Sequence, residues 1–436
     1  NLVIIMLSPS DTFLGFNSGL SNQDGQYNTF LGFSSGNANT SGISNTFLGH
    51  GAGYSNTIGS QNVFIGAAAG LNHTEGGSNV SIGYEAGRGD SGGETGDYNI
   101  FIGRGAGYSA STGISNVMLG YYTGYNITNG ESNVFLGTQA GYENTYGDKN
   151  VYLGNYAGHS GSGSQNVLIG DHAGYANTTS QNVFVGESAG ESNTSGSRNV
   201  FLGFSSGQEN LTGWQNTYIG SQSGMQNQGD FNTFLGYWAG GDNVNGNNNV
   251  FLGRRAGQNT DGSYNVYVGH KAGEGHIGDG NVIIGNEAGT YRSGSNQFII
   301  ANSDTTQLVY GEFDNSILRV DGSLGVGKDP TENLDVNGTI KTINFQMTSG
   351  ATDGYVLKSD ASGNAVWSDP YDDDWTVSGT DVYYNTGQVG IGTISPAASL
   401  HIKQPGTTIS SGIRFETSQG TGEDWYLYMN GSDNFI

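Results

Sequence analysis

The residue types that could catalyse a reaction or bind a metal are scattered along this 436-residue chain. Its seven histidines occupy variable positions, with no recurring carboxylate or serine beside them. A catalytic triad needs a nucleophile, a base and an orienting acid together, and a zinc site needs several ligands at one point. The sequence predicts neither. The histidines are His50, His73, His159, His172, His270, His276 and His401.

One cluster of carboxylates stands near the C-terminal part of the chain. Asp369, Asp372, Asp373 and Asp374 precede Trp375. Calcium favours clustered carboxylates, but a run of this kind is more often a solvated linker. We therefore assign no catalytic, cofactor-binding or metal residue, and we expect no cofactor and no enzymatic activity.

A short glycine motif resembles part of a phosphate-binding loop. In Gly325-Val326-Gly327-Lys328, however, Asp329 and Pro330 follow where a Ser or Thr and a helix should stand. A β-turn explains the two glycines, so no nucleotide site is predicted.

Any functional surface must instead be positioned by a repeat. A nine-residue core, Asn-[Thr/Val]-[aromatic]-[Leu/Ile]-Gly-x-x-[Ala/Ser]-Gly, occurs eighteen times between Asp11 and Ile300. Successive cores begin sixteen or seventeen positions apart, except for one interval of twenty, from Asn79 to Asn99, and a last interval of fifteen, from Asn281 to Asn296. The core keeps its length while the connector varies, as expected for a structural coil with an outer loop. The cores begin at Asp11, Asn28, Asn45, Asn62, Asn79, Asn99, Asn116, Asn133, Asn150, Asn166, Asn182, Asn199, Asn216, Asn232, Asn249, Asn265, Asn281 and Asn296.

Each core predicts one short strand. Two glycines per core would each cost a helix about 0.5 to 1 kcal/mol, whereas the first five positions have the alternation and β-branched or aromatic content of a strand. The predicted fold is all-β, a parallel β-solenoid (β-roll) of about 18 coils of 16–17 residues.

Alternation within the strand divides the core positions between two faces. Position 4 is aliphatic in every copy, and position 2 is aliphatic or Thr in every copy but the last, where it is Gln297. We therefore expect both positions to fill the coil interior, with Leu31, Leu48 and Ile65 fully buried. The Asn at position 1 is expected to stack from coil to coil as a hydrogen-bonded ladder. An alternative is that Asn only tolerates the turn.

Position 3 is then expected to point outward although it is aromatic in fourteen copies. So large an apolar stripe must be covered, either by another copy of the chain or by a second sheet of the same coil. We expect Phe47, Phe64, Phe135, Phe184 and Phe201 at or near contacts between chains, or against a sheet that itself meets a neighbouring chain. The fourteen are Phe13, Phe30, Phe47, Phe64, Phe101, Phe135, Tyr152, Phe184, Phe201, Tyr218, Phe234, Phe251, Tyr267 and Phe298.

These cores, with Asn-x-x-Gly connectors such as Asn39–Gly42 and Asn193–Gly196, resemble repeats of bacterial surface proteins and phage tail-fibre proteins. They are also related in pattern to the β-roll heads of trimeric autotransporter adhesins. The adhesin repeat is typically shorter and has a small residue in place of Phe. The resemblance covers the repeat region from Asp11 to Ile300 and implies an elongated homotrimer outside the cell.

The periodic pattern stops after Asp304, where two related strings follow. Leu324–Pro330 with Leu334–Gly338 is echoed by Val389–Pro396 with Leu400–Ile402, and both resemble the shaft of tail-fibre-type proteins. The predicted domains are residues 1–10 as an N-terminal strand or the end of an upstream segment, 11–303 as the solenoid, and 304–369 and 370–436 as two shaft-like β modules.

Composition narrows the classes of partner. A formal charge of −24 argues against nucleic acid, the absence of Cys excludes disulfides, and no segment is apolar and long enough to span a bilayer. Tyrosines recur after the second core glycine, which suits either sugar recognition or lateral packing. They are Tyr54, Tyr108, Tyr125, Tyr142 and Tyr175, near Tyr121, Tyr122, Tyr237 and Trp238.

The favoured hypothesis is a non-enzymatic extracellular fibre or adhesin on a bacterial surface or phage-like particle. It would be a homo-oligomer, expected to be a trimer, that presents repeated weak sites to a cell-surface glycan or another receptor. The alternative is a tailspike-like polysaccharide-degrading enzyme with paired carboxylates in a groove. An ice-binding solenoid is disfavoured, because Thr occupies position 2 in only five copies and that position is expected to point inward. The five are Thr12, Thr29, Thr46, Thr217 and Thr233.

Overall fold

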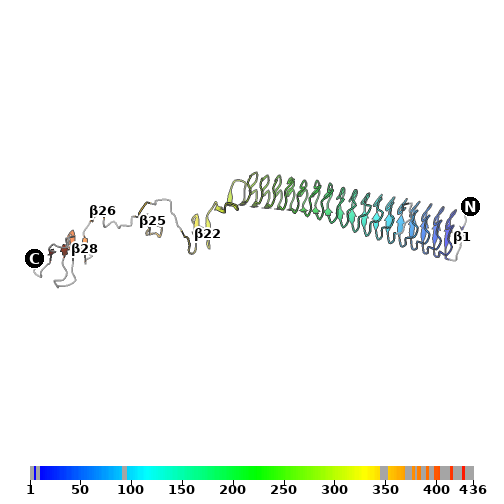
Figure 1. Cartoon of the computed structure of the whole chain (residues 1–436), viewed down its shortest axis with the longest axis horizontal. Coiled ribbons are helices and arrows are strands. Elements are labelled where there is room, and N and C mark those ends of the chain that lie inside the picture. The colour runs from blue at the N-terminus through cyan, green and yellow to red at the C-terminus, as the bar shows by residue number, and fades with distance from the viewer. Residues whose placement is uncertain are drawn as a thin grey trace, which may run out of the picture. The chain divides into compact units, whose positions relative to one another are not determined.

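The computed structural model describes residues 10–90, 96–343, 352–368 and 397–400, together with short strands outside those ranges. The chain forms two compact units, residues 1–338 and 339–436. Throughout the described residues the regular structure consists of strands and turns. Most of the first unit is a parallel β-solenoid with one strand per coil (Figure 1), as predicted.

Eighteen strands of the solenoid pair in parallel order, each with the equivalent strand of the next coil. They are β2 (Thr12–Leu14), β3 (Thr29–Leu31), β4 (Thr46–Leu48), β5 (Val63–Ile65), β6 (Val80–Ile82), β7 (Ile100–Ile102), β8 (Val117–Leu119), β9 (Val134–Leu136), β10 (Val151–Leu153), β11 (Val167–Ile169), β12 (Val183–Val185), β13 (Val200–Leu202), β14 (Thr217–Ile219), β15 (Thr233–Leu235), β16 (Val250–Leu252), β17 (Val266–Val268), β18 (Val282–Ile284) and β19 (Gln297–Ala301). Hydrogen bonds between coils continue through the connectors, as from Ala38 N to Tyr54 O at 2.9 Å.

The interior of the coil is an aromatic column, which reverses the predicted assignment of faces. Phe30, Phe47 and Phe64 at position 3 have no exposed surface, and their rings stack at centroid distances of 4.7 and 4.9 Å. Leu31 and Leu48 at position 4 are instead exposed and Ile65 is half-buried. The predictions that these aliphatic residues fill the core and that the Phe row points outward are both wrong.

The two core glycines explain how a ring fits inside so small a coil. Gly53 has a φ of +60°, and a Cβ there would lie 2.6 Å from the ring of Phe47 in the same coil. Gly49 has a φ of +145°, and a Cβ there would overlap the carbonyl oxygen of Gly66 in the next coil. Glycine alone permits both the backbone conformation and the close contact.

The Asn at position 1 forms the predicted ladder inside the coil. The side-chain oxygen of Asn28 accepts a hydrogen bond from the backbone nitrogen of Asn45 at 3.0 Å. The side-chain nitrogen of Asn45 then donates to the carbonyl oxygen of Gly59, where the same coil closes, at 2.8 Å. The ladder therefore satisfies buried backbone groups at every turn. Asp11 in the first coil can only accept, and one of its carboxylate oxygens has no partner.

A second Asn ladder runs through the connectors and was not predicted from the sequence. Asn39 donates to Asn22 at 2.7 Å, and Asn56 donates to Asn39 at 2.8 Å. Both Asn39 and Asn56 are fully buried. The Asn-x-x-Gly spacing of the connectors was the available signal, because the Asn side chain also contacts the Gly three residues later.

The last coil is shifted by one residue from its predicted alignment. Val282, Ile283 and Ile284 pair with Phe298, Ile299 and Ile300, so Ile299 is buried and Phe298 faces outward. Gln297 therefore replaces Asn at position 1, and its backbone nitrogen donates to the side-chain oxygen of Asn281 at 2.8 Å. The predicted placement of Gln297 at position 2, Phe298 at position 3 and Ile299 at position 4 is wrong. Gln297 lies sixteen positions after Asn281 and so keeps the period, whereas Asn296 would have shortened it.

The core is divided into two hydrophobic clusters rather than being continuous. One contains Phe13 to Ala69 and the other begins at Ala86. They are separated around the long coil that starts at Asn79, where Ser81 takes the place of Phe. In the coil before it, His73 lies 5.4 Å from the ring of Phe64. This region is the weakest point of the apolar interior.

Short strands follow and precede the solenoid. β1 (Ile4–Ile5) pairs antiparallel with β2. β20 (Gln307–Glu312) and β21 (Ile317–Val320) extend the sheet antiparallel from β19. β22 (Leu324–Val326) pairs in parallel with β23 (Leu334–Val336), which completes the strands of the first unit.

The second unit repeats one pairing of the first. β28 (Val389–Ile391) and β29 (Leu400–Ile402) pair in parallel like β22 and β23, so the echo between the two sequence strings has a structural counterpart. The predicted limits at 303/304 and 369/370 stay predictions. The other pairs are antiparallel: β24 (Val356–Ser359) with β25 (Ala365–Ser368), β26 (Thr376–Ser378) with β27 (Asp381–Tyr383), and β30 (Ile413–Phe415) with β31 (Trp425–Leu427).

The aromatic column predicts which substitutions unfold the solenoid. Phe201→Ala should lower the free energy of unfolding by about 3–5 kcal/mol, because it leaves a cavity between two stacked rings. Val200→Thr, on the outer side of the same strand, should change it by less than about 1 kcal/mol. Denaturant unfolding followed by circular dichroism measures both, and equal losses would contradict the interior position of Phe201.

Candidate functional site

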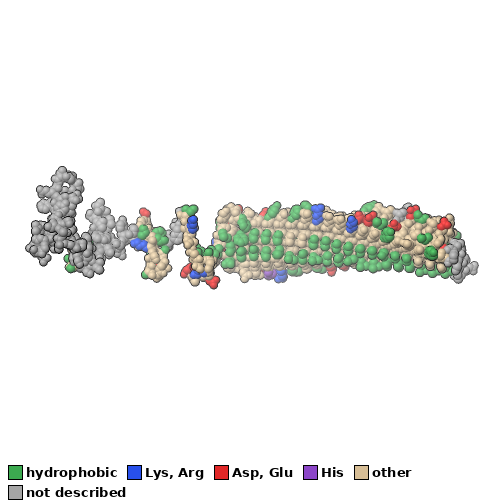
Figure 2. All heavy atoms as spheres, turned by 90° about the horizontal axis from the view of Figure 1, so that it is seen from below, with side chains coloured by type: hydrophobic (Ala, Val, Ile, Leu, Met, Phe, Trp, Pro, Cys, Tyr) green, Lys and Arg blue, Asp and Glu red, His purple; other side chains and the backbone are tan. Residues whose placement is uncertain are grey.

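The largest candidate surface is the outer side of the strands, which we call the apolar face and define as positions 2 and 4 of β2 to β19. Its rows run the length of the solenoid as parallel bands of hydrophobic side chains (Figure 2). Leu48 is 41% exposed, Leu136 43% and Leu235 44%. Because the aromatic column occupies the inner side, the aliphatic side chains of the same strands cannot be buried within the coil.

The dimensions of the apolar face exceed those of an ordinary surface patch. Seventeen steps of about 4.8 Å and a three-residue strand of about 10 Å give a flat strip of roughly 800 Å². The largest apolar patch of a typical monomer measures roughly 300–600 Å². A strip of this area equals one partner's share of a standard protein interface, also about 800 Å².

The apolar face contains no charged residue, although the chain has a formal charge of −24. Position 2 is Val in most coils, and position 4 is Leu, Ile or Val in all of them. The five Thr of position 2 point outward, so the inward direction predicted for them is wrong. They remain a minority in the row, and no regular array of hydroxyl groups results.

Four of the five recurrent tyrosines form a second surface feature together with His159, a stacked ladder on the outside of five successive coils. Tyr108, Tyr125, Tyr142, His159 and Tyr175 lie 4.5–5.1 Å apart with ring planes within 11° of parallel. Inside such a stack each ring covers the face of its neighbour, so mainly edges and hydroxyl groups meet solvent. Sugar binding by ring stacking, one of the two predicted uses, is therefore unavailable to the middle of the ladder.

The ladder also affects ionisation. Burial, supported by the neighbouring Tyr108 and Tyr142, raises the pKa of Tyr125 to about 12. Partial burial lowers the pKa of His159. Both groups are thus held neutral near pH 7, which suits packing better than proton transfer.

Two of the seven histidines are interior residues that replace Asn in the second ladder. Burial lowers the pKa of His73 to about 4, and its Nε2 lies 3.2 Å from the side-chain nitrogen of Asn79. Burial also lowers the pKa of His276, which contacts Gln297 at 3.3 Å. The hydroxyl of Tyr267 lies 3.5 Å from Nδ1 of His276, but burial raises the pKa of this Tyr and keeps it protonated, so both histidines fill a structural position.

Among the other described histidines, His159 and His172 are neighbours that both contact the rings of Tyr156 and Tyr175. His172 lies 2.7 Å from the adjacent Asp171, and His270 lies 3.0 Å from Asn286. His50 stacks on Phe33 at 5.3 Å. The side chain of His401 lies outside the described residues. Apart from the neighbouring His159 and His172, the six described histidines lie apart in space, as they do in the sequence.

The glycine motif near Lys328 belongs to a pair of strands. Gly325 lies within β22, and the side-chain nitrogen of Lys328 forms an ion pair with Asp335 of β23 at 2.9 Å. Hydrogen bonds from Thr331, then from Lys328, lower the pKa of Asp335 to about 2. The lysine is occupied by this contact, and the turn lacks the helix that a phosphate-binding loop requires.

The described residues contain neither a metal-binding cluster nor a membrane-spanning helix. Among the described residues, no three His, Cys, Asp or Glu side chains form a group that could hold a metal. The carboxylates from Asp369 to Asp374 lie outside those residues, so the calcium alternative stays open. The described part of the chain also has no helix of the length and apolarity needed to cross a bilayer.

Comparisons with known proteins returned no relative. No protein-family model, no curated protein and no solved structure matches the chain. The resemblance to adhesins and tail fibres therefore rests on the repeat pattern alone.

The buried His73 predicts a dependence of stability on pH. Its pKa in the folded state lies below the ordinary value of 6.5, so the unfolded chain binds the proton more readily. Stability should be lost as the pH falls from about 6.5 to about 4, by up to about 3 kcal/mol from this residue. His73→Asn restores the Asn found in the two preceding coils and should remove that part of the loss. Parallel unfolding curves of the two proteins at pH 7.5 and pH 4.5 measure it, and an identical pH dependence would refute the assignment.

Proposed function

We propose that the protein is a non-enzymatic extracellular fibre that assembles from identical copies through the apolar face and serves attachment. The observation that carries the proposal is the exposed double row of aliphatic side chains along the whole solenoid (Figure 2). Each exposed Leu or Val gains about 25 cal/mol per Å² of apolar surface removed from water. Burial of a strip of this size against a partner is therefore strongly favourable.

A second copy of the same chain is the partner that fits the strip best. The partner must be equally long, straight and apolar, with side chains repeated at the same spacing along the rod. Copies related by rotation about an axis parallel to the rod meet these conditions, because each coil then meets the same coil of its neighbour. A face without charge also lets chains of −24 each approach along their least repulsive side.

A trimer is the proposed form of the assembly. Three copies around one axis can bury three narrow strips in a common centre while the connectors stay outside. The resemblance to trimeric adhesin heads and tail fibres favours the same number. This arrangement implies a location on a bacterial surface or a phage-like particle.

Attachment would use the sides of the coils that the assembly leaves free. Connectors vary in sequence and carry many Asn, Ser, Asp and Tyr side chains, which suit hydrogen bonding to a glycan or another surface receptor. Identical weak sites on parallel chains act together, so the assembly binds more tightly than one chain. The proposed mechanism is therefore multivalent and mechanical, and no catalytic residue takes part.

Charges placed on the apolar face should dissociate the fibre without unfolding the coil. In Leu119→Glu, Leu136→Glu and Leu202→Glu combined, the new carboxylates can remain in water on a single chain but would be buried in an assembly. Native mass spectrometry and analytical ultracentrifugation should show the oligomer replaced by monomer, with the circular dichroism spectrum unchanged.

A matched control places the same three charges on connectors. Ile43→Glu, Ile114→Glu and Leu211→Glu alter side chains of similar exposure, 43%, 37% and 45%, away from the apolar face. The control should keep the wild-type mass. A wild-type protein that is already monomeric, or a face variant with an unaltered oligomer, would disprove assembly through this face.

A further inference from the structure

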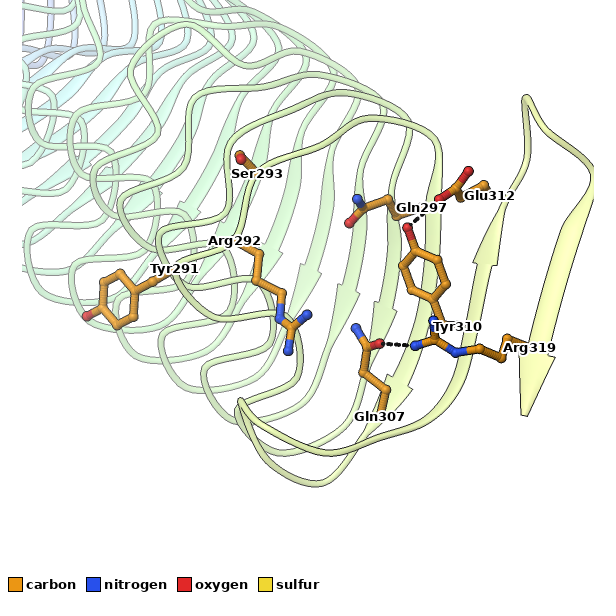
Figure 3. A pocket seen from close by; sticks show the side chains of 8 residues that line it. All are labelled: Tyr291, Arg292, Ser293, Gln297, Gln307, Tyr310, Glu312 and Arg319. Carbon is orange, nitrogen blue, oxygen red and sulfur yellow. Dashed lines mark hydrogen bonds between the residues drawn. The ribbon is translucent and has the colours of Figure 1, made fainter. Parts of the chain in front are cut away.

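A polar pocket lies where the coils end and the sheet continues without them. After β19 the chain returns as β20 and then β21, which pair antiparallel and add two strands beyond the last coil. The inner side of these strands is bordered by the final turn of the solenoid at Tyr291, Arg292 and Ser293. The resulting cavity has a volume of about 520 Å³ (Figure 3).

Strand register places the polar side chains on the inner side of the sheet. Tyr310 pairs with the buried Ile299, and Gln307 pairs with the buried Ala301. Arg319 of β21 pairs in turn with Tyr310. Since directly paired residues point to the same side of a sheet, these side chains continue the line of the solenoid interior. The polar side chains of Gln307, Tyr310 and Arg319 thus lie beyond the end of the aromatic column.

The pocket contains a buried hydrogen-bond donor without a partner. Gln307 is only 9% exposed, and its side-chain nitrogen makes no hydrogen bond. Its side-chain oxygen accepts from Arg319 at 3.2 Å, so the amide nitrogen points away from Arg319, toward the side of the pocket where Arg292 lies (Figure 3). A buried donor without a partner costs about 1–3 kcal/mol, and a ligand oxygen would remove that cost.

A guanidinium group without an ion pair faces the same space. Arg292 donates to the carbonyl oxygen of Asp304 at 2.7 Å and forms no ion pair with any described residue. Figure 3 shows it extending into the opening toward Gln307, while Tyr291 points away. Arg319, by contrast, is neutralised by Asp321 at 2.6 Å. Arg292 is therefore the uncompensated positive charge of the pocket.

The opposite side of the pocket offers an acceptor and an aromatic ring. Glu312 accepts hydrogen bonds from Tyr310 at 2.8 Å and from Asn315 at 2.6 Å, and these bonds lower its pKa. The ionised carboxylate can accept further bonds from hydroxyl groups. Arg319 lies 5.0 Å from the centre of the Tyr310 ring.

We propose that this pocket binds a carboxylate-bearing sugar residue of a glycan. The carboxylate would contact Arg292 and the free amide nitrogen of Gln307, and the ring hydroxyls would donate to Glu312. Charge-assisted bonds from a guanidinium are the strong ones for carboxylates, and a cavity of this volume lies within the range of small-ligand sites. The inference rests on the proposed attachment function, for which it names the class of ligand.

The position of the pocket is compatible with assembly through the apolar face. Val309 and Leu318 are neighbours of Tyr310 and Arg319 in sequence and therefore point to the other side of the sheet. The apolar face continues on that other side, so covering it leaves the pocket open. Ligand binding and oligomer formation can thus succeed or fail separately.

Isothermal titration calorimetry of the full chain with trigalacturonate and with 3′-sialyllactose tests the proposal. We expect binding of at least one of the two acids, and at least tenfold weaker binding of the corresponding methyl ester. Arg292→Gln removes the charge, and Gln307→Glu replaces the free donor by an acceptor, so each should weaken binding of the acid at least tenfold. Arg198→Gln, an exposed arginine on a distant coil, should bind as the wild type does.

Each contrary outcome overturns the inference. No binding of either acid at millimolar concentration removes the site, and equal binding of acid and ester removes the role of the carboxylate. If a folded Arg292→Gln protein binds the acid as tightly as the wild type does, the ligand lies elsewhere. The same conclusion follows if Arg198→Gln weakens binding as much as Arg292→Gln does. Native mass spectrometry of the same samples reports the oligomer independently, so absence of binding by an intact oligomer would overturn this inference and leave the proposed fibre standing.

Discussion

Stacking of one side chain per coil, an aromatic ring in thirteen of the eighteen coils, is the interaction on which the rest of the structure depends. Within each core, the residues at positions 1, 3 and 5 face one way and those at positions 2 and 4 face the other. Once the ring at position 3 is inside, Asn at position 1 must be inside too, where its amide bonds both to the next coil and to the end of its own coil. The Gly at position 5 must then accept close contact with the next backbone.

The same constraint generates the surface. A coil whose interior holds the position-3 side chain, one Ala, Ser or Thr, and one or two Asn has no room for the aliphatic residues, which are left on the outer side of every strand. Each coil exposes only a small apolar area, but the coils are stacked in register, so these areas join into a continuous strip along the solenoid. Function in this account follows from that strip and from the place where the coils stop, since the pocket exists only because β20 and β21 continue the sheet past the last ring.

The sequence was sufficient to predict the fold, its period and the first Asn ladder. A single core could be read as more than one element, but eighteen copies with the same pattern favour one strand per coil. The sequence did not show which side of each strand faces the coil interior, because Phe47 and Leu48 are both apolar and alternation alone does not tell which of them is inside. The signal was present in Asn45: a ladder that satisfies turn backbone groups must be internal, and position 3 shares its face. That link places Phe184 and Phe201 inside the coil, where they are fully buried, and not on the outward side that alternation alone predicts for them.

Other features depend on contacts that no repeat pattern encodes. The pocket joins Arg292 on a final turn to Gln307 and Arg319 on strands that lack the repeat, so only the fold brings them together. The shift of the last coil was readable from the period, because Gln297 keeps the spacing of sixteen positions and its side chain can replace that of Asn.

Crosslinking at a single introduced cysteine tests the central claim most directly, because the chain has no Cys of its own. Leu136→Cys places the thiol in the middle of the apolar face. Tyr146→Cys places it on a connector, at a position where the native Tyr is 65% exposed. Treatment with a short bismaleimide should join Leu136→Cys chains to one another, residue to identical residue, and leave Tyr146→Cys chains mostly single. Efficient crosslinking of the connector variant with none at Leu136→Cys would contradict the account, as it would place the apolar face away from any partner copy.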